Sequence, residues 1–396
     1  MKRILLSVVV AAMFATSVWA IDETMNPLIT SMPSLSIAPD ARSAGMGDLG
    51  VATDADLNSQ YWNPAKFAFM QSKGGITANY TPWLRKLGVT DIDLAHLEGY
   101  YNFGDRAGGI GASFTYFSMG DVQITGANNE DYGTCRPNEW ALDLSYYRKL
   151  HEYVSMAVAL RFMYSDLNNG IDLGGGYEMH AAWTMAADIA LYYRQPIQLP
   201  MGTSYFSLGL NLSNLGGKMT YDEVTRNFIP AMMRIGANYE LPFNKYNSLT
   251  FSLQADKMMV PSRKSKFAPQ FDENDETTWQ LSQDAYSELT SVKGIFWSFA
   301  DAPRGAKEEF QEVRWGAGLE YSYNKQFFAR FGYSYENFYK GNRNYLTVGA
   351  GFHLSIFSLD VAYCIGLAAS NPLDQTMRFT VGFDLAGIKD LVNNKR

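Results

Sequence analysis

Few residues of this 396-residue chain have the spacing of a reactive site. The segment 45–50 matches G-x-G-x-x-G, a pattern in which glycines let the backbone of a dinucleotide-binding loop approach a pyrophosphate. No hydrophobic strand precedes this segment, and the carboxylate of Asp48 would repel phosphate groups. Gly45 and Gly47 are better explained as turns or close contacts in a tightly packed segment.

Acidic side chains offer oxygen ligands at two places, Asp54 with Asp56 and the run 272–276, but neither has the glycine and closing glutamate of a calcium loop. A solvated acidic loop is the favoured interpretation. The four histidines are scattered, without an H-E-x-x-H or G-x-S-x-G pattern. Cys135 and Cys364 lack C-x-x-C spacing, and modification of Cys135 stays open. The sequence therefore predicts no enzyme, metal or cofactor.

Segments of about ten residues, with alternating apolar and polar side chains, repeat from about Gly74 to Leu385. The clearest segment is 313–324, whose apolar face consists of Val313, Trp315, Ala317, Leu319, Tyr321 and Tyr323. Because successive side chains of a strand point to opposite faces, one face suits lipid and the other water. We therefore expect Leu319→Arg to be harmful and Gly318→Ser to be mild. A soluble β-sandwich also alternates, but its solvated face should carry more Lys and Glu.

The segments number roughly fourteen, which predicts an all-β transmembrane outer-membrane barrel of antiparallel strands. Short connections follow the even-numbered segments, and long ones follow the odd-numbered segments, as short periplasmic turns and long extracellular loops would. The longest runs from about 260 to 311. Tyrosine pairs at 100–101, 146–147 and 192–193 should end three strands and form an interfacial girdle, although the strand preference of Tyr is an alternative explanation.

The segments outside the barrel have different compositions. Residues 1–20 have the charged start, apolar core and small-residue end of a signal peptide, which predicts export; a single membrane anchor is the alternative. Residues 21–73 contain prolines and glycines and should form a plug or hatch in the lumen, with a short amphipathic helix at 61–70. The barrel spans 74–385, and 386–396 form a periplasmic tail. The net charge of -7 argues against a nucleic-acid partner.

Aromatic residues in the long loop could bind another protein, because exposed aromatic clusters often mark contact sites. Packing of these rings on the barrel rim is the alternative. Candidates in this loop and in two other outer loops are Trp279, Phe296, Trp297, Phe299, Trp83 and Tyr132.

The N-terminal block resembles a known family. It reads A-P-D-A-R-S-A from Ala38, continues through the glycines to V-A-T at 51–53, and then reads Y-W-N-P-A-K from Tyr61. Together with Y-T-P-W-L-R from Tyr80, this block is similar to the PorV (LptO) family of the type IX secretion system, within the wider FadL-like superfamily of outer-membrane barrels. The motif residues that carry the resemblance are Arg42, Gly45, Gly47, Asp48, Trp62, Asn63 and Pro64.

The resemblance implies a non-enzymatic carrier that is surrounded by outer-membrane lipid. Such a carrier would bind the C-terminal signal domain of secreted cargo at a type IX translocon of the SprA/Sov kind. It would then deliver the cargo to a PorU-like sortase at the cell surface. The alternative is a FadL-like channel for hydrophobic small molecules, and co-purified partners or lipids would distinguish the two functions.

Overall fold

The computed structural model describes residues 25–125, 131–170, 179–222, 224–354, 356–367 and 373–385. The predicted signal peptide and the predicted tail at 386–396 lie outside these residues. Within the described part of the chain, no helix combines the length and the apolar character needed to cross a membrane.

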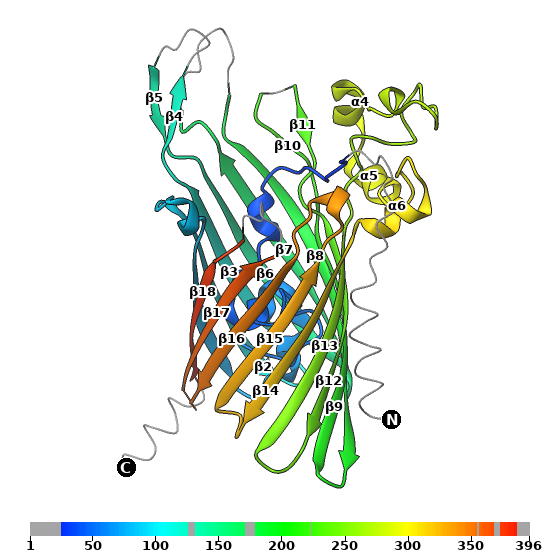
Figure 1. Cartoon of the computed structure of the whole chain (residues 1–396). Coiled ribbons are helices and arrows are strands. Elements are labelled where there is room, and N and C mark those ends of the chain that lie inside the picture. Colours follow the sequence, from blue (N-terminus) through cyan, green and yellow to red (C-terminus); the bar gives the residue numbers. More distant parts are fainter. Residues whose placement is uncertain are drawn as a thin grey trace.

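Fourteen antiparallel strands of the described chain form a closed barrel (Figure 1), which confirms the predicted fold class. The barrel closes where β1 pairs with β18, with Ile76 opposite Phe383. The strands are β1 Gly74–Pro82, β2 Ile92–Gly104, β3 Gly108–Met119, β6 Asn138–His151, β7 Val154–Asp166, β8 Ala182–Leu199, β9 Gly202–Gly216, β12 Met232–Pro242, β13 Asn247–Met258, β14 Val313–Tyr323, β15 Phe327–Tyr335, β16 Tyr345–His353, β17 Phe357–Gly366 and β18 Met377–Asp384.

The predicted alternation of side chains is confirmed along the wall. In β14, Leu319 and Tyr321 are exposed on the outer face, whereas Glu320 and Ser322 are buried on the inner face. Small and charged polar side chains therefore line the interior, and apolar side chains meet the membrane, as a transmembrane barrel requires.

Leu319→Arg should destabilise the barrel by roughly 2 to 4 kcal/mol, because it places a charge at mid-strand on the lipid face. Leu319 is 37% exposed and lies between Phe251 of β13 and Phe331 of β15. Tyr323→Arg is the matched control, since Tyr323 ends β14 at a turn and a charge there should cost about 0 to 1 kcal/mol. Heat-modified gel mobility measures both, and equal stability of the two variants would contradict the assigned depth.

The connections divide the barrel into a short-turn end and a long-loop end. At the short-turn end the strands are joined by 105–107, 152–153, 200–201, 243–246, 324–326 and 354–356. At the long-loop end (top of Figure 1) the loops carry η3 Arg85–Leu87, β4 Val122–Thr125, β5 Asp131–Cys135, β10 Met219–Thr220, β11 Arg226–Asn227 and η5 Phe338–Lys340. The longest connection, 259–312, is here called the helical loop; it contains η4 Glu276–Thr278, α4 Gln283–Glu288, α5 Ser291–Trp297 and α6 Ala306–Gln311.

Only the outward ring of a tyrosine pair can belong to the predicted girdle. Because neighbouring side chains of a strand face opposite ways, Tyr101 and Tyr146 point to the membrane, but Tyr100, Tyr147 and Tyr192 are buried in the lumen. None of the pairs ends its strand; β8 continues beyond its pair to Leu199. The inward rings pack against residues 65–70 of the N-terminal segment instead.

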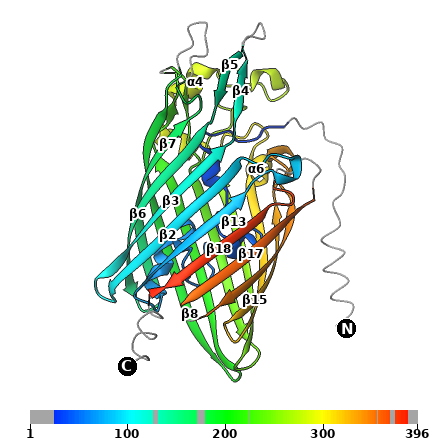
Figure 2. The same ribbon diagram turned by 90° about the vertical axis from the view of Figure 1, so that its left-hand side faces the viewer.

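Residues 25–73, called the plug segment below, run from the long-loop rim into the barrel in both views (Figures 1 and 2). The segment forms η1 Pro33–Ser36, α2 Ala41–Ala44, α3 Ser59–Trp62 and η2 Pro64–Phe69. The prediction of one amphipathic helix at 61–70 is wrong, because Asn63 is extended (φ -167°) and separates α3 from η2. Pro64 to Ala68 are all buried, so η2 has no solvated face.

Candidate functional site

Arg42 of α2 ties the plug segment to the barrel wall. Its Nε and Nη2 donate to the two carboxylate oxygens of Glu320 on β14, at 3.1 and 2.9 Å. Its Nη1 donates to Asp56 of the plug segment at 2.7 Å. Glu320 also accepts from Arg330 of β15 at 2.6 Å, and Arg330 donates to Asp360 of β17. A chain of buried, hydrogen-bonded charges therefore links the plug segment to three strands.

Asp48 anchors the glycine motif in the same way. One carboxylate oxygen accepts from Arg378 of β18 and the other from the hydroxyl of Tyr345 on β16, each at 2.6 Å. The acidic residue that argued against a phosphate site is thus a buried partner of an arginine. The motif binds the barrel wall.

The glycines of the motif allow the two backbones to touch. Gly47 has a φ of 85°, and its amide donates to Thr347 of β16 at 2.9 Å. On β15, which faces the motif, a Cβ on Gly332 would lie 2.0 Å from the carbonyl carbon of Met46. A Cβ on Gly45 would lie 3.0 Å from the wall at Gly349. Glycine is needed here for close approach, as the sequence indicated.

The expectation that Gly318→Ser is mild is wrong for the same reason. A Cβ at Gly318 would lie 2.6 Å from the carbonyl oxygen of Met46. The inner face of β14 meets the plug segment at this point, not water. The alternation along β14 identified the inward face of the strand, but it did not show that the plug segment covers that face.

The motif Trp62-Asn63-Pro64 fixes the second half of the plug segment. The indole of Trp62 donates to Asp40 at 2.7 Å. The amide of Asn63 donates to the carbonyls of Val51 (3.0 Å) and Leu191 of β8 (2.9 Å), and its oxygen accepts from the Ala65 amide. Pro64 occupies the first turn of η2, where no backbone donor is needed.

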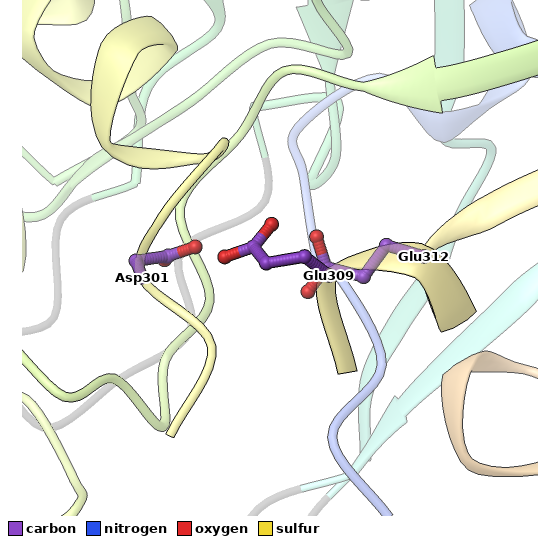
Figure 3. A group of neighbouring side chains, drawn as sticks. All are labelled: Asp301, Glu309 and Glu312. Atoms are coloured by element: carbon purple, nitrogen blue, oxygen red, sulfur yellow. The ribbon is translucent and has the colours of Figure 1, made fainter. Parts of the chain in front are cut away.

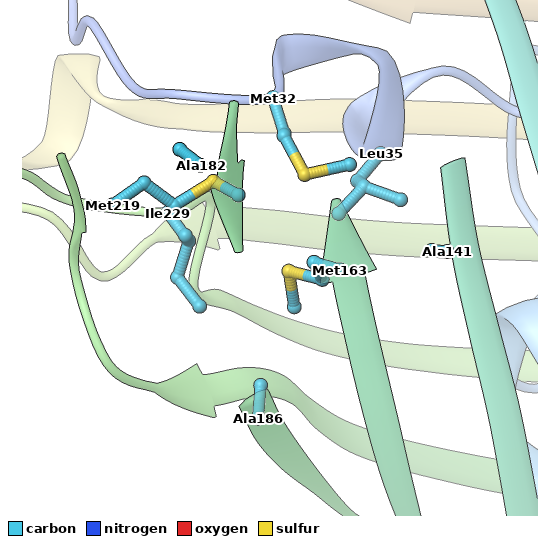
Figure 4. Close-up of a cluster of buried hydrophobic side chains, with 8 residues drawn as sticks. All are labelled: Met32, Leu35, Ala141, Met163, Ala182, Ala186, Met219 and Ile229. Atoms are coloured by element: carbon cyan, nitrogen blue, oxygen red, sulfur yellow. The ribbon is translucent and has the colours of Figure 1, made fainter. Parts of the chain in front are cut away.

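The plug segment closes the lumen toward the long-loop end with apolar side chains. Met32 and Leu35 pack against Met163 of β7, Met219 of β10 and Ile229 (Figure 4), and all five side chains are buried. On the other side of the plug segment, a polar cavity of about 400 Å³ extends to residues beside the short turns. The described residues thus place an apolar cluster toward the long-loop end and a polar cavity toward the short turns.

The helical loop exposes some of the predicted contact residues and buries others. Phe296 of α5 is 73% exposed and Phe299 is 44% exposed. Trp297 points the other way and packs on Phe267, with ring centroids 4.5 Å apart. Trp279 is only 5% exposed, and its indole donates to the carbonyl of Asp272. Trp279 therefore belongs to the interior of the loop and not to its contact surface.

The two remaining predicted contact residues, Trp83 and Tyr132, lie in other loops at the long-loop end. Trp83 is partly buried against Phe117 and the cluster formed by Tyr345, Cys364 and Leu373. Tyr132 lies in β5, and its side chain is outside what the structure describes. Both cysteines are buried free thiols.

The acidic residues that were considered as calcium ligands have partners that the sequence did not suggest. Asp54 accepts from Arg194 at 3.2 Å and Asp56 from Arg42, so both neutralise arginines. The run 272–276 is mostly exposed, and Asp275 caps η4 by accepting from the Thr277 amide.

The sequence analysis missed Glu320 and Arg330. Their opposite charges lie on the inner faces of neighbouring strands, which was a usable signal once the register was known.

One solved outer-membrane barrel shares the fold, and others are similar to a lower degree. The TodX deltaS2S3 mutant monoaromatic hydrocarbon channel is 10% identical, with a TM-score of 0.51 over 87% of this chain and 97% of that one. The Pseudomonas putida toluene transporter TodX has a TM-score of 0.48 at 11% identity, over 91% of this chain and 98% of that one. A Pseudomonas aeruginosa FadL homologue has a TM-score of 0.40 at 11% identity, over 91% and 100%. No curated protein matches the sequence.

The family model described as type IX secretion system protein PorV matches residues 20–265. This range is most of the chain and contains the plug motif and the barrel strands from β1 through β13. The chain therefore belongs to the PorV family, and it is an outer-membrane β-barrel of the type IX secretion system.

Proposed function

We propose that this barrel carries the C-terminal signal domain of secreted proteins from a type IX translocon to a cell-surface sortase. In this proposal the long-loop end faces the exterior and the helical loop holds the cargo. The observation that carries the proposal is the group of exposed apolar side chains on that loop, Val292, Phe296 and Phe299. Val292 and Phe296 lie four residues apart on α5 and so share one side of the helix.

Helix caps and a buried cluster hold the helices of the helical loop against the barrel rim. The side chains of Ser282 and Thr290 cap α4 and α5. A buried cluster that includes Val260, Leu281 and Tyr286 holds the helices on the barrel rim. Exposed aromatic rings on an ordered support lose little side-chain freedom on binding, and aromatic residues are frequent among the residues that dominate interface energy.

A channel for hydrophobic small molecules is the less favoured function. Such a channel needs a path past the plug segment. In the described residues that path is filled by the Met32 and Leu35 contacts, and the salt bridges of Arg42 and Asp48 hold the segment in place. These contacts of the plug segment therefore favour a role for the rim over a role for the interior.

Replacing both Phe296 and Phe299 with Ala should weaken cargo binding by about 1 to 3 kcal/mol if the rings fill a pocket of the cargo domain. Binding is measured by pull-down of a secreted protein's C-terminal domain. Phe338→Ala is the matched control, because Phe338 is also an exposed ring (56%) at the long-loop end but lies on η5. Equal recovery by the double variant, the control and the unchanged protein would reject the helical loop as the cargo site.

A further inference from the structure

Acidic side chains are buried together where the helical loop returns to the barrel. Asp301 follows α5, Glu309 lies on α6, and Glu312 lies between α6 and β14. One carboxylate oxygen from each lies within 4.8 Å of the other two (Figure 3). Asp301 is fully buried, and the side chain of Glu312 has no exposed area. Carboxylates packed this closely repel one another strongly unless a positive charge lies among them.

Two lysines neutralise only part of this charge. Lys257 of β13 lies 3.2 Å from Glu309 and 2.7 Å from Glu312. Lys340 of η5 lies 2.9 Å from Glu312 and 2.6 Å from Glu308. The group thus holds the four carboxylates of Asp301, Glu308, Glu309 and Glu312 against two ammonium groups, which leaves two negative charges when all are ionised.

Asp301 has the oxygen that is left without a partner. Its Oδ2 accepts from the backbone amide of Ser262 at 2.6 Å, but its Oδ1 has no hydrogen-bond partner among the described residues. A buried carboxylate oxygen without a partner is costly, so a proton or a cation must compensate it. Burial and the nearby Glu312 raise the pKa of Asp301 to about 8, which reflects the same excess of negative charge.

We propose that Asp301, Glu309 and Glu312 bind a calcium ion that holds the helical loop on the barrel rim. A divalent cation matches the two uncompensated charges, and calcium prefers carboxylate oxygens in a flexible arrangement. Lys257 and Lys340 donate to both carboxylate oxygens of Glu312, and Lys257 also donates to Oε2 of Glu309. Asp301 Oδ1, which has no partner among the described residues, is therefore the ligand on which the site depends.

The proposed ion joins the segment that follows α5 to α6 and to the start of β14. Asp301 follows α5, which carries Phe296, whereas Glu309 and Glu312 adjoin β14. Calcium would therefore reduce local opening of the helical loop without changing the barrel. The loop contains exposed Lys293, so trypsin can report on its opening.

The test compares the full chain in detergent with calcium and with a chelator. With the unchanged protein, calcium should slow tryptic cleavage of the helical loop and give a binding isotherm by calorimetry, with a Kd in the range of about 10⁻⁴ to 10⁻³ M that extracellular sites show. Asp301→Asn should weaken calcium binding by about tenfold or more. This variant also removes the uncompensated charge. In the presence of the chelator it should therefore resist trypsin to the same extent as the unchanged protein does in the presence of calcium.

Asp284→Asn is the matched control, since Asp284 is an exposed carboxylate of α4 in the same loop, and it should respond to calcium like the unchanged protein. No calorimetric binding by the unchanged protein would overturn the proposal. Equal calcium responses of Asp301→Asn and the unchanged protein would also overturn it. If lowering the pH from 9 to 7 protects the helical loop from trypsin and calcium has no effect, Asp301 holds a proton and not a metal ion, which also contradicts the proposal.

Discussion

Arg42→Met should release the plug segment and cost about 3 to 5 kcal/mol, because it leaves the carboxylates of Glu320 and Asp56 buried with one cation fewer. Methionine keeps much of the volume of the arginine stem, so the loss comes from charge and not from a cavity. Cells that make the variant should take up more of a large hydrophilic antibiotic that an intact outer membrane excludes. Thermal unfolding of the purified barrel measures the loss of stability.

Arg136→Met provides the control for Arg42→Met. Arg136 forms an ion pair of similar length with Asp121 (2.7 Å), but both side chains are more than half exposed. Exposed pairs contribute about 0 to 1 kcal/mol, so uptake and stability should hardly change. If both methionine variants behave alike, the plug segment is not held by the buried charges.

Gly332→Ala should displace the glycine motif of the plug segment from β15. The new Cβ would lie 2.0 to 2.5 Å from the backbone of Met46 and Gly47, where no flexible side chain can move aside. Overpacking of this kind costs typically about 1 to 3 kcal/mol. Protease cleavage within residues 40–60 and antibiotic uptake should both increase, while heat-modified mobility shows that the barrel itself still forms.

Gly99→Ala is the corresponding control on the outer face of β2. Its Cβ would lie 3.2 Å from Ile76 and Gly75, so a small shift can accommodate it. Protease resistance of the plug segment in both variants would mean that close backbone contact does not seat the motif.

The wall of the barrel was predictable because the alternation of apolar and polar residues is a local property of each strand. Leu319 and Glu320 could be assigned to opposite faces from their neighbours alone. The contacts across the lumen could not be predicted, because they join residues far apart in the sequence, such as Arg42 with Glu320. The same limitation explains the inward tyrosines, whose partner Phe67 lies in the plug segment.

The sequence showed that the helical loop is rich in aromatic residues, but it did not show which of their rings are exposed. Phe296 and Trp297 are neighbours in the sequence, yet one is exposed and the other packs on Phe267. Trp279 looked equivalent to both and is buried. Such a loop has short helices and no long periodic pattern, so its sequence does not show which rings form its own core.

Cross-linking in living cells tests the central claim most directly. A photo-reactive phenylalanine analogue replaces Phe296 on the helical loop or, as a control, Tyr246 at the short-turn end, where the ring is 53% exposed. The proposed function predicts that illumination links the Phe296 position, but not the Tyr246 position, to the C-terminal domain of a secreted protein. Cross-links to cargo at neither position, in cells that secrete the cargo normally, would contradict the claim that this loop carries it.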